Sequence, residues 1–255
     1  MSLYTLVRAA ATHPRASRAS AGGNFKAEID DFVRSEDRVR LLGDLPRKGA
    51  RVVVLDSSFN PPHYAHLELA SLGMTNTRDN CILLLLSITN ADKKPAPAAF
   101  EQRLEMMELF KNSIDAEVVL GLTKEPYFVD KYKVIKRLLG THNLNPHLHF
   151  PMGLDTLVRL VDQKYYKEPV SEALKDFFND CHVHVLTRDD ILFKLEELPE
   201  QWQRHIHMSK HSSKTDGVSS SNVRALVKSH KRHQDFERLV PPQILAYIVE
   251  HGLYK

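Results

Sequence analysis

The sequence has little cysteine and no long run of apolar residues. Only Cys81 and Cys181 occur among its 255 residues. Two cysteines make no disulfide framework, and each stands where an apolar stretch begins, so we expect buried free thiols in a reducing compartment. The longest uninterrupted apolar run, residues 81–86, is far too short to cross a membrane as a helix. We therefore expect neither a disulfide-stabilised secreted protein nor a membrane partner.

A strong excess of charge of one sign is also missing. The formal net charge is +3 at pH 7, with 26% charged and 42% hydrophobic residues. These values are ordinary for a globular protein. A mildly basic balance suits an anionic small molecule as well as nucleic acid. The basic segment 228–233 has little aromatic support, so we expect a solvated helix end there and no nucleic-acid partner.

Acidic residues are absent from the first 24 positions, which contain Arg8, Arg15 and Arg18. This composition is shared by mitochondrial transit peptides and by poorly packed N-terminal arms. We favour the arm, and with it a cytoplasmic or nuclear protein rather than a mitochondrial one. Residues 1–50 are accordingly predicted to form an N-terminal arm and helix, and residues 51–255 the main domain.

Short apolar strands alternate with stretches of helical spacing. This alternation predicts an α/β fold: a doubly wound, mostly parallel sheet with helices on both faces. Ligands of such sheets bind beyond the carboxyl ends of the strands, near the point where strand order reverses. The expected strands are 51–55, 81–88, 116–122, 147–153, 182–187 and 204–209. The expected helices are 25–43, 67–73, 99–112, 128–139, 154–163, 170–179, 219–229 and one that starts at Pro241-Pro242.

The loop after the first of these strands places two histidines three residues apart. In VVVLDSSFNPPHYAH, residues 52–66, His63 and His66 fall on one face at the first turn of a helix. A helix N-terminus attracts anions through its free N–H groups and its dipole. Two imidazoles placed there suit a polyphosphate. A capped turn with solvent-facing histidines is the alternative, while a zinc site lacks a third ligand at a recognisable spacing.

Polar residues also follow two other strands. Lys93 and Lys94 come after the second strand of the main domain, where they could contact phosphate or be solvated. The fourth strand is followed by Gly153 and Asp155. Glycine permits close approach of the backbone to a ligand. The aspartate could cap the next helix, accept hydrogen bonds from ribose hydroxyls, or do both.

A serine-rich segment opens a helix near the C-terminal end. In VSSSNVR, residues 218–224, Ser219 and Ser220 precede Arg224 by about one turn. Hydroxyls, free backbone N–H groups and an arginine form a second anion site, unless the serine is an ordinary N-cap beside a surface arginine. The nucleotide motifs GxGxxG and GxxxxGK[ST] are both absent.

Four motifs resemble one enzyme family. SSFNPPHYAH (57–66) resembles the GSFNP…HxGH element of nucleotidylyltransferases, MGLD (152–155) their GxD, and VSSSNVR (218–224) their ISSTxxR. VPPQILAYIVEHGLY (240–254) resembles the C-terminal element of nicotinamide mononucleotide (NMN) adenylyltransferases. The motifs occur in family order across residues 51–255, which we take as the nucleotidylyltransferase domain. The chain is most similar to a divergent, fungal side branch of that family.

The resemblance implies a Rossmann-like fold that binds ATP and a pyridine mononucleotide. The implied reaction is NMN + ATP → NAD + pyrophosphate, with NMN or nicotinate mononucleotide as acceptor. Mg²⁺ or another divalent cation would be bound mainly through the ATP phosphates, without a metal site of the protein's own. An oligomer is compatible with the resemblance.

Individual roles are carried over by motif position. The resemblance implies that His66, His63 and Arg224 are catalytic, with His66 meeting the α-phosphate in the transition state. The residues implied in ATP binding are Ser57, Ser58, Phe59, His63, His66, Lys93, Lys94, Gly153, Asp155, Ser219, Ser220 and Arg224. The residues implied in binding NMN are Ser58, Phe59, Asn60, Tyr127, Phe128, Asp155, Tyr165 and Tyr166.

The sequence departs from the family pattern at several of these positions. Ser57 and Ala65 stand where the family has glycine, and tyrosines or Phe128 stand where it has two tryptophans. The only tryptophan, Trp202, lies outside the motifs and is expected in the core. Two alternatives therefore stay open: a related nucleotidylyltransferase or ATP hydrolase that acts on another acceptor, and a non-catalytic nucleotide-binding regulator.

Three His-x-His pairs are not absorbed by these motifs. They occupy positions 147/149, 182/184 and 205/207. Within a strand, the two histidines of each pair share one face. A metal site would require the pairs to converge; otherwise they are polar residues at the ends of a sheet.

Overall fold

The computed structural model describes residues 25–76, 79–89, 97–187, 193–229 and 233–255. Its centre is a seven-stranded sheet in the order β1-β4-β3-β2-β5-β6-β7. β1 runs antiparallel to β4, and all other neighbouring strands are parallel. The strands are β1 Val39–Leu42, β2 Arg51–Asp56, β3 Asn80–Ser87, β4 Glu117–Thr123, β5 Leu148–Gly153, β6 Cys181–Thr187 and β7 Ile206–Lys210.

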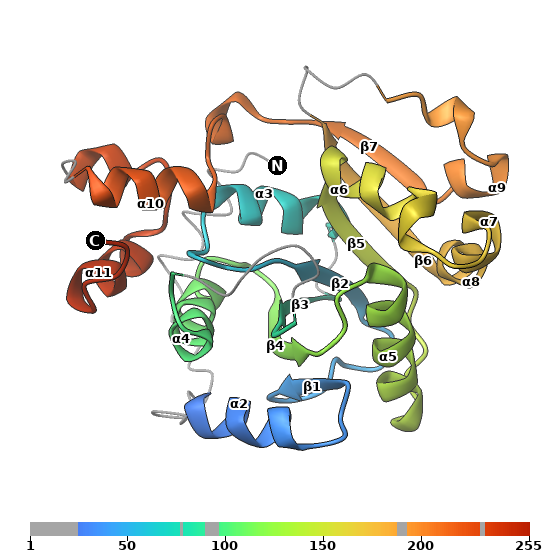
Figure 1. Ribbon diagram of the computed structural model, residues 1–255, viewed down its shortest axis with the longest axis horizontal. Coiled ribbons are helices and arrows are strands. Elements are labelled where there is room, and N and C mark those ends of the chain that lie inside the picture. Colours follow the sequence, from blue (N-terminus) through green and yellow to red (C-terminus); the bar gives the residue numbers. More distant parts are fainter. Residues whose placement is uncertain (1–24, 77–78, 90–96, 188–192, 230–232) are drawn as a thin grey trace.

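Helices cover both faces of the sheet (Figure 1). Side chains of successive residues in β2 point to opposite faces, so Val53 and Leu55 join one core layer while Val52 and Val54 join the other. The first layer is closed by α2 Phe25–Arg34, α3 Tyr64–Gly73, α4 Phe100–Lys111, α10 Ser220–Lys228 and α11 Pro242–Glu250. The second is closed by α5 Phe128–Thr141, α6 Leu154–Leu160, α7 Val170–Ala173, α8 Lys175–Asp180 and α9 Glu200–Gln203. The predicted doubly wound α/β fold is confirmed.

The strand order reverses at β2, which is flanked by β3 on one side and β5 on the other. The loops that follow β2 and β5 therefore leave the sheet side by side at its carboxyl edge. This is the crevice in which doubly wound sheets bind ligands. The two loops contain the SSFNPPH and GLD residues singled out above.

The helix predicted over residues 25–43 is wrong in its second half. Helix α2 ends at Arg34, and residues 39–42 form β1, which extends the sheet beside β4. Apolar residues at a spacing of three fit the buried side of a helix, but in so short a segment they also fit an edge strand. The periodicity alone could not separate the two.

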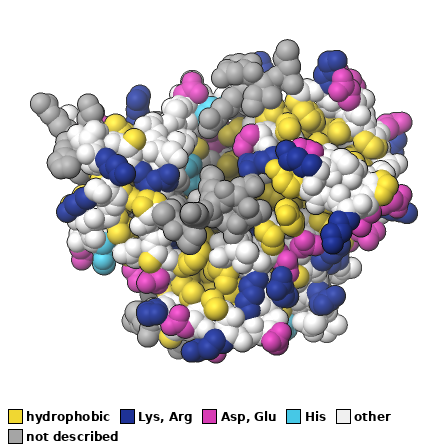
Figure 2. Space-filling model, in the orientation of Figure 1, with side chains coloured by type: hydrophobic (Ala, Val, Ile, Leu, Met, Phe, Trp, Pro, Cys, Tyr) yellow, Lys and Arg dark blue, Asp and Glu magenta, His cyan; other side chains and the backbone are white. Residues whose placement is uncertain are grey.

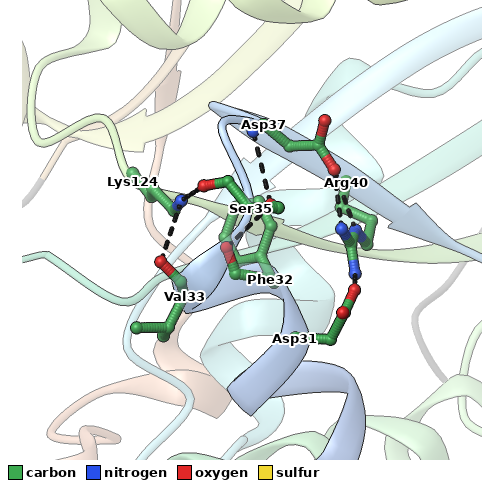
Figure 3. Close-up of polar contacts among 7 residues, drawn as sticks. All are labelled: Asp31, Phe32, Val33, Ser35, Asp37, Arg40 and Lys124. Atoms are coloured by element: carbon green, nitrogen blue, oxygen red, sulfur yellow. Dashed lines mark hydrogen bonds and ion pairs between the residues drawn. The ribbon is translucent and has the colours of Figure 1, made fainter.

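Side-chain hydrogen bonds end α2 and turn the chain into β1 (Figure 3). The Ser35 hydroxyl donates to the carbonyl of Phe32 at 2.9 Å and accepts from the N–H of Asp37 at 3.3 Å. Arg40 then donates to Asp31 and Asp37, at 2.6 Å each, which ties the start of the strand back to the helix. These local contacts compete with helix continuation, as is typical of serine and aspartate.

Other boundaries differ less. The helix predicted over 170–179 consists of α7 and α8 with Leu174 between them.

Both cysteines are buried free thiols, as expected. Within the described ranges, no helix is long and apolar enough to cross a membrane. Basic and acidic side chains are interspersed over the face shown in Figure 2, in keeping with the small net charge. The division of the chain at residue 50 stays a prediction.

Candidate active site

The loop after β2 is held in an unusual backbone conformation. Phe59 is fully buried and has a φ of +44°, in the left-handed region that residues with a side chain rarely adopt. Such a conformation costs on the order of 1–3 kcal/mol and persists where the surroundings enforce it, often at functional sites. The Phe59 ring packs against His66 with a centroid distance of 5.0 Å. The loop is therefore packed against the first turn of α3, through the contact of Phe59 with His66.

His66 is a neutral hydrogen-bond donor in this arrangement. Its Nδ1 accepts from the backbone N–H of His63 at 3.1 Å, so the single hydrogen of the neutral ring is on Nε2. That Nε2–H faces the hydroxyl of Ser57 at 2.9 Å. Burial and the neighbouring His63 hold the pKa of His66 well below its usual value. Any other acceptor for this Nε2–H must either displace the Ser57 hydroxyl or share the hydrogen with it.

The two histidines predicted to share one helix face are in contact. Their rings stack with centroids 3.7 Å apart and an interplanar angle of 19°. His63 is the N-cap residue of α3, and His66 lies in the first turn. Both side chains are buried, so the alternative of solvent-facing histidines is wrong. The backbone N–H groups of Tyr64 and His66 at this helix start already donate to the carbonyls of Leu239 and His63, at 3.0 and 2.9 Å, so the donor that the histidines add here is the Nε2–H of His66.

The N-terminus of α10 is joined directly to this loop. The Ser220 hydroxyl donates to the carbonyl of Pro61, and Arg224 Nη1 donates to the carbonyl of Asn60, both at 2.8 Å. Ser219 caps the helix by accepting from the N–H of Asn222 at 3.1 Å. The two segments that the sequence analysis predicted separately as anion sites are therefore hydrogen-bonded to each other.

Tyr254 contributes to the site from the far end of the chain. Its hydroxyl donates to Asn60 Oδ1 at 2.8 Å, and its ring is buried. This contact joins the two ends of the proposed domain, 194 positions apart. The sequence analysis missed this role, although Tyr254 closes the C-terminal motif quoted above. Through this bond the last residue of that motif holds the side-chain amide of the loop after β2.

The loop after β5 approaches from the neighbouring strand. Gly153 is the N-cap residue of α6, and a Cβ added there would lie 2.7 Å from Asp155 Oδ1, so a larger residue would crowd the carboxylate. The N-cap position of α6 is taken by Gly153, and Asp155 lies in the first turn of the helix, where a negative charge is favoured. Its carboxylate is exposed and pairs with Arg159 at 2.9 Å. It remains accessible to a sugar hydroxyl.

Four aromatic residues were predicted to stack on a pyridine ring, and they differ in how far they are buried in the core. They are Tyr127, Phe128, Tyr165 and Tyr166. Tyr127 and Tyr165 lie near each other, with centroids 6.2 Å apart, and Tyr127 is 41% exposed. Tyr166 instead donates to the carbonyl of Leu160 at 2.7 Å, and it packs with Phe128 against the core. Tyr127 is therefore the most exposed of the four, and Tyr165 lies beside it with Lys164 Nζ 4.9 Å from its ring centroid.

A buried ion pair near these aromatics was missed from the sequence. Lys131 Nζ lies 2.5 Å from Asp56 Oδ2, and the two side chains are 4% and 12% exposed. Lys131 also lies 5.2 Å from the ring centroid of Phe128. A lysine one turn into α5, between the apolar Val129 and Tyr132, was the available signal. The two lysines that the sequence analysis did name, Lys93 and Lys94, lie outside the described residues.

The structure gives no cage for a metal ion within the described part of the chain, where no three histidine, cysteine, aspartate or glutamate side chains converge suitably. The His-x-His pairs do gather on one face of β5, β6 and β7. His149 Nδ1 lies 3.1 Å from His184 Nε2, and His182 Nδ1 lies 3.1 Å from His207 Nε2. These are pairwise contacts between rings near the amino ends of the strands, away from the active-site loops.

Comparisons with known proteins agree with this geometry. The model of the cytidylyltransferase-like family matches residues 54–226. A candidate NMN adenylyltransferase of Schizosaccharomyces pombe is 36% identical over 239 residues, which are 86% of this chain and 92% of that protein. A candidate nicotinate-nucleotide adenylyltransferase of Desulfotalea psychrophila is 24% identical, over 80% of this chain and 99% of its own.

Solved structures show the same fold. Two structures of Plasmodium falciparum nicotinic acid mononucleotide adenylyltransferase, one complexed with NaAD and one with APC, give TM-scores of 0.58 and 0.59. Their sequences are 18% and 16% identical to this one, and each match covers 80% of this chain and 97% of that one. The match over residues 54–226 shows that the chain belongs to the cytidylyltransferase-like family, and its 36% identity to the S. pombe protein places it, within that family, among the nicotinamide mononucleotide adenylyltransferases.

Proposed function

We propose that this protein transfers AMP from ATP to nicotinamide or nicotinate mononucleotide, giving the dinucleotide and pyrophosphate. The observation that carries the proposal is the joining of two anion sites at the strand-order reversal. Ser220 and Arg224 of α10 bond to the loop that leads into the histidines of α3. A triphosphate needs this kind of extended cationic and N–H-rich surface.

The chemistry assigned to the site is positioning and charge stabilisation. The acceptor phosphate, with a second pKa near about 6, is largely a dianion at neutral pH and needs no general base. His66 would donate its Nε2–H to the α-phosphate as charge moves toward the leaving pyrophosphate. Arg224, Ser219 and Ser220 would hold the departing β- and γ-phosphates. His63 would orient His66 through its backbone N–H, and its own ring would face the phosphates.

The remaining candidates would bind the nucleosides. The exposed carboxylate of Asp155 would accept from ribose hydroxyls beside Gly153, and Tyr127 and Tyr165 would hold the pyridine ring between aromatic faces. Ser57, Ser58, Phe59 and Asn60 would line the phosphate loop. A divalent cation such as Mg²⁺ would be held mainly through the ATP phosphates and would neutralise part of their charge.

One assay separates the proposal from its two alternatives. The protein is incubated with Mg-ATP and either mononucleotide, and dinucleotide, pyrophosphate and free phosphate are measured. Dinucleotide and pyrophosphate in equal amounts support adenylyl transfer. Phosphate release without dinucleotide supports a hydrolase or another acceptor, and ATP binding without turnover supports a regulator. The ratio of kcat/KM for the two mononucleotides then identifies the preferred acceptor.

Replacing Arg224 with alanine is expected to raise KM for ATP by about tenfold to a hundredfold, because a charge-assisted contact to phosphate and the bond to Asn60 are both lost. Initial rates at varied ATP measure this change. Arg224→Lys should recover only part of it, since lysine cannot make two parallel contacts. Arg204→Ala is the matched control, because Arg204 is exposed and pairs with Glu200 on α9. Kinetics of Arg224→Ala equal to those of the control would remove Arg224 from the site.

A further inference from the structure

Glu68 is a buried carboxylate that none of the steps above uses. It lies on α3, two positions beyond His66, and is 4% exposed. A buried carboxylate is strongly unfavourable unless donors satisfy its oxygens. The partners of Glu68 therefore show what this position holds together.

The described partners of its carboxylate belong to one short segment, residues 211–215, between β7 and α10. Glu68 Oε1 accepts from the backbone N–H of Ser212 at 2.6 Å. Oε2 accepts from the hydroxyl of Thr215 and lies 3.2 Å from His211 Nδ1. The carboxylate thus joins α3 to a segment about 145 positions further along the chain through one backbone N–H and one hydroxyl, with the His211 ring beside them.

The 211–215 segment determines where α10 begins. Thr215 is 1% exposed, and its carbonyl accepts from the N–H of Val218 at 3.0 Å. Val218 is itself buried and is followed at once by Ser219, the N-cap of α10. A displacement of Thr215 would therefore be passed to the serines and to Arg224.

We propose that Glu68 is a positioning residue for adenylyl transfer. It clamps the 211–215 segment against α3, so that the phosphate-binding start of α10 keeps its register with His63 and His66. Ser220 and Arg224 bond α10 to the loop that leads into α3, and Glu68 adds a second link between α3 and the segment that leads into α10. The inference rests on the proposed function, because it assigns β- and γ-phosphate binding to α10.

Two nearly isosteric variants test the clamp. Glu68→Gln keeps the side-chain shape but removes the charge and one acceptor, and Thr215→Val keeps the branched shape but removes the hydroxyl donor. Each should raise KM for ATP, and Kd for Mg-ATP and for pyrophosphate, by about tenfold or more, with KM for the mononucleotide changed less than about twofold. Thr215→Ser, which keeps the hydroxyl, should restore ATP binding to near the level of the unmodified protein.

Controls separate positioning from folding. Glu200→Gln is the matched control, since Glu200 is an exposed glutamate of α9 that pairs with Arg204. Amide exchange at Ser212 should speed up in Glu68→Gln while the melting temperature stays close to that of the control. A purely structural role would instead reduce the active fraction, which lowers apparent kcat and leaves KM and Kd for ATP unchanged. That result would overturn the clamp.

The clamp and the proposed function can fail separately. If the unmodified protein binds Mg-ATP but makes no dinucleotide, the proposed reaction is wrong, and the Kd values for Mg-ATP still decide whether Glu68 positions α10. If the unmodified protein is active and the Glu68→Gln and Thr215→Val variants match the control, the clamp alone is wrong. An unmodified protein that binds no ATP overturns both.

Discussion

Replacing His66 with alanine is expected to lower kcat by about a hundredfold to a thousandfold, the range found for loss of one preorganised donor to a transition-state oxyanion. Affinity for ATP should change much less, because His63, the serines and Arg224 would still bind the phosphates. The reason lies in the free protein: the imidazole is neutral, buried and locked with its hydrogen on Nε2 by the N–H of His63. Steady-state rates and equilibrium binding of Mg-ATP measure the two quantities separately.

His142→Ala provides the matched control for this substitution, because His142 lies exposed at the end of α5. The melting temperatures of both variants should be compared first, since removal of a buried ring leaves a cavity. A folded His66→Ala protein that turns over at near-normal rates would remove His66 from the chemistry. Equal losses in kcat and in ATP affinity would give His66 a binding role without a specific contribution to the transition state.

The Ser57 hydroxyl sets a particular condition on that step. Family members have glycine at the matching position, and here a hydroxyl accepts the very hydrogen assigned to the α-phosphate. The donor is therefore satisfied when no nucleotide is bound, and ATP must replace one hydrogen bond by another. Such an exchange gains less than a new bond would, except that the phosphate oxygen is charged and accepts more strongly than a hydroxyl. Ser57 is thus compatible with catalysis, and its effect is on the free protein, where its hydroxyl occupies the His66 donor before ATP binds.

The sheet could be predicted from the sequence because its strands are short apolar runs. VVVL in β2 and CILLLL in β3 have no alternation, which indicates strands buried on both faces, and the structure confirms it. The loops were predictable for a related reason, since parallel strands all deliver their carboxyl ends to one edge. β1 could not be predicted in this way, because an edge strand of four residues depends on pairing with β4.

Contacts between distant parts of the chain were beyond the sequence analysis. Serine, arginine and two histidines at helix starts were recognisable, but nothing in one sequence shows that Arg224 bonds to Asn60 or Tyr254 to its side chain. The clamp formed by Glu68 was hidden for the same reason, since nothing in the sequence pairs this glutamate, which stands between Leu67 and Leu69, with Ser212 and Thr215. The division of the aromatics depends on packing: Tyr165 and Tyr166 are adjacent, yet only Tyr166 bonds to Leu160.

Acid is expected to destabilise the fold strongly through the histidines of β5, β6 and β7. Burial is the main cause that lowers the pKa of His149 to about 3 and that of His184 to about 4, with the nearby Arg51 contributing to both. In an unfolded chain a histidine titrates near about 6.5. Below that pH the unfolded state takes up protons that the folded state does not, so stability is intact above about pH 6.5 and falls until the folded pKa is reached.

The size of the effect follows from the width of this window. Between pH 7.5 and 5, each buried histidine should lower the free energy of unfolding by about 1–2 kcal/mol after allowance for solvent screening, or about 2–4 kcal/mol for the two. His182, whose pKa is also lowered to about 4 mainly by burial, contacts both of its neighbouring strands and adds to the trend. Urea unfolding at several pH values measures the slope.

Substitution shows whether these rings are the source. His184→Leu replaces a buried ring, 8% exposed, with an apolar side chain that has no proton to gain. Its stability should fall by about 1–2 kcal/mol less than that of the unmodified protein over the same pH interval, whatever its value at pH 7.5. His142→Ala, with an exposed histidine, should leave the slope unchanged. If His184→Leu and the unmodified protein lose stability in parallel, His184 is not an acid-sensitive group, and the other histidines with lowered pKa values, among them His149 and His66, must account for the loss.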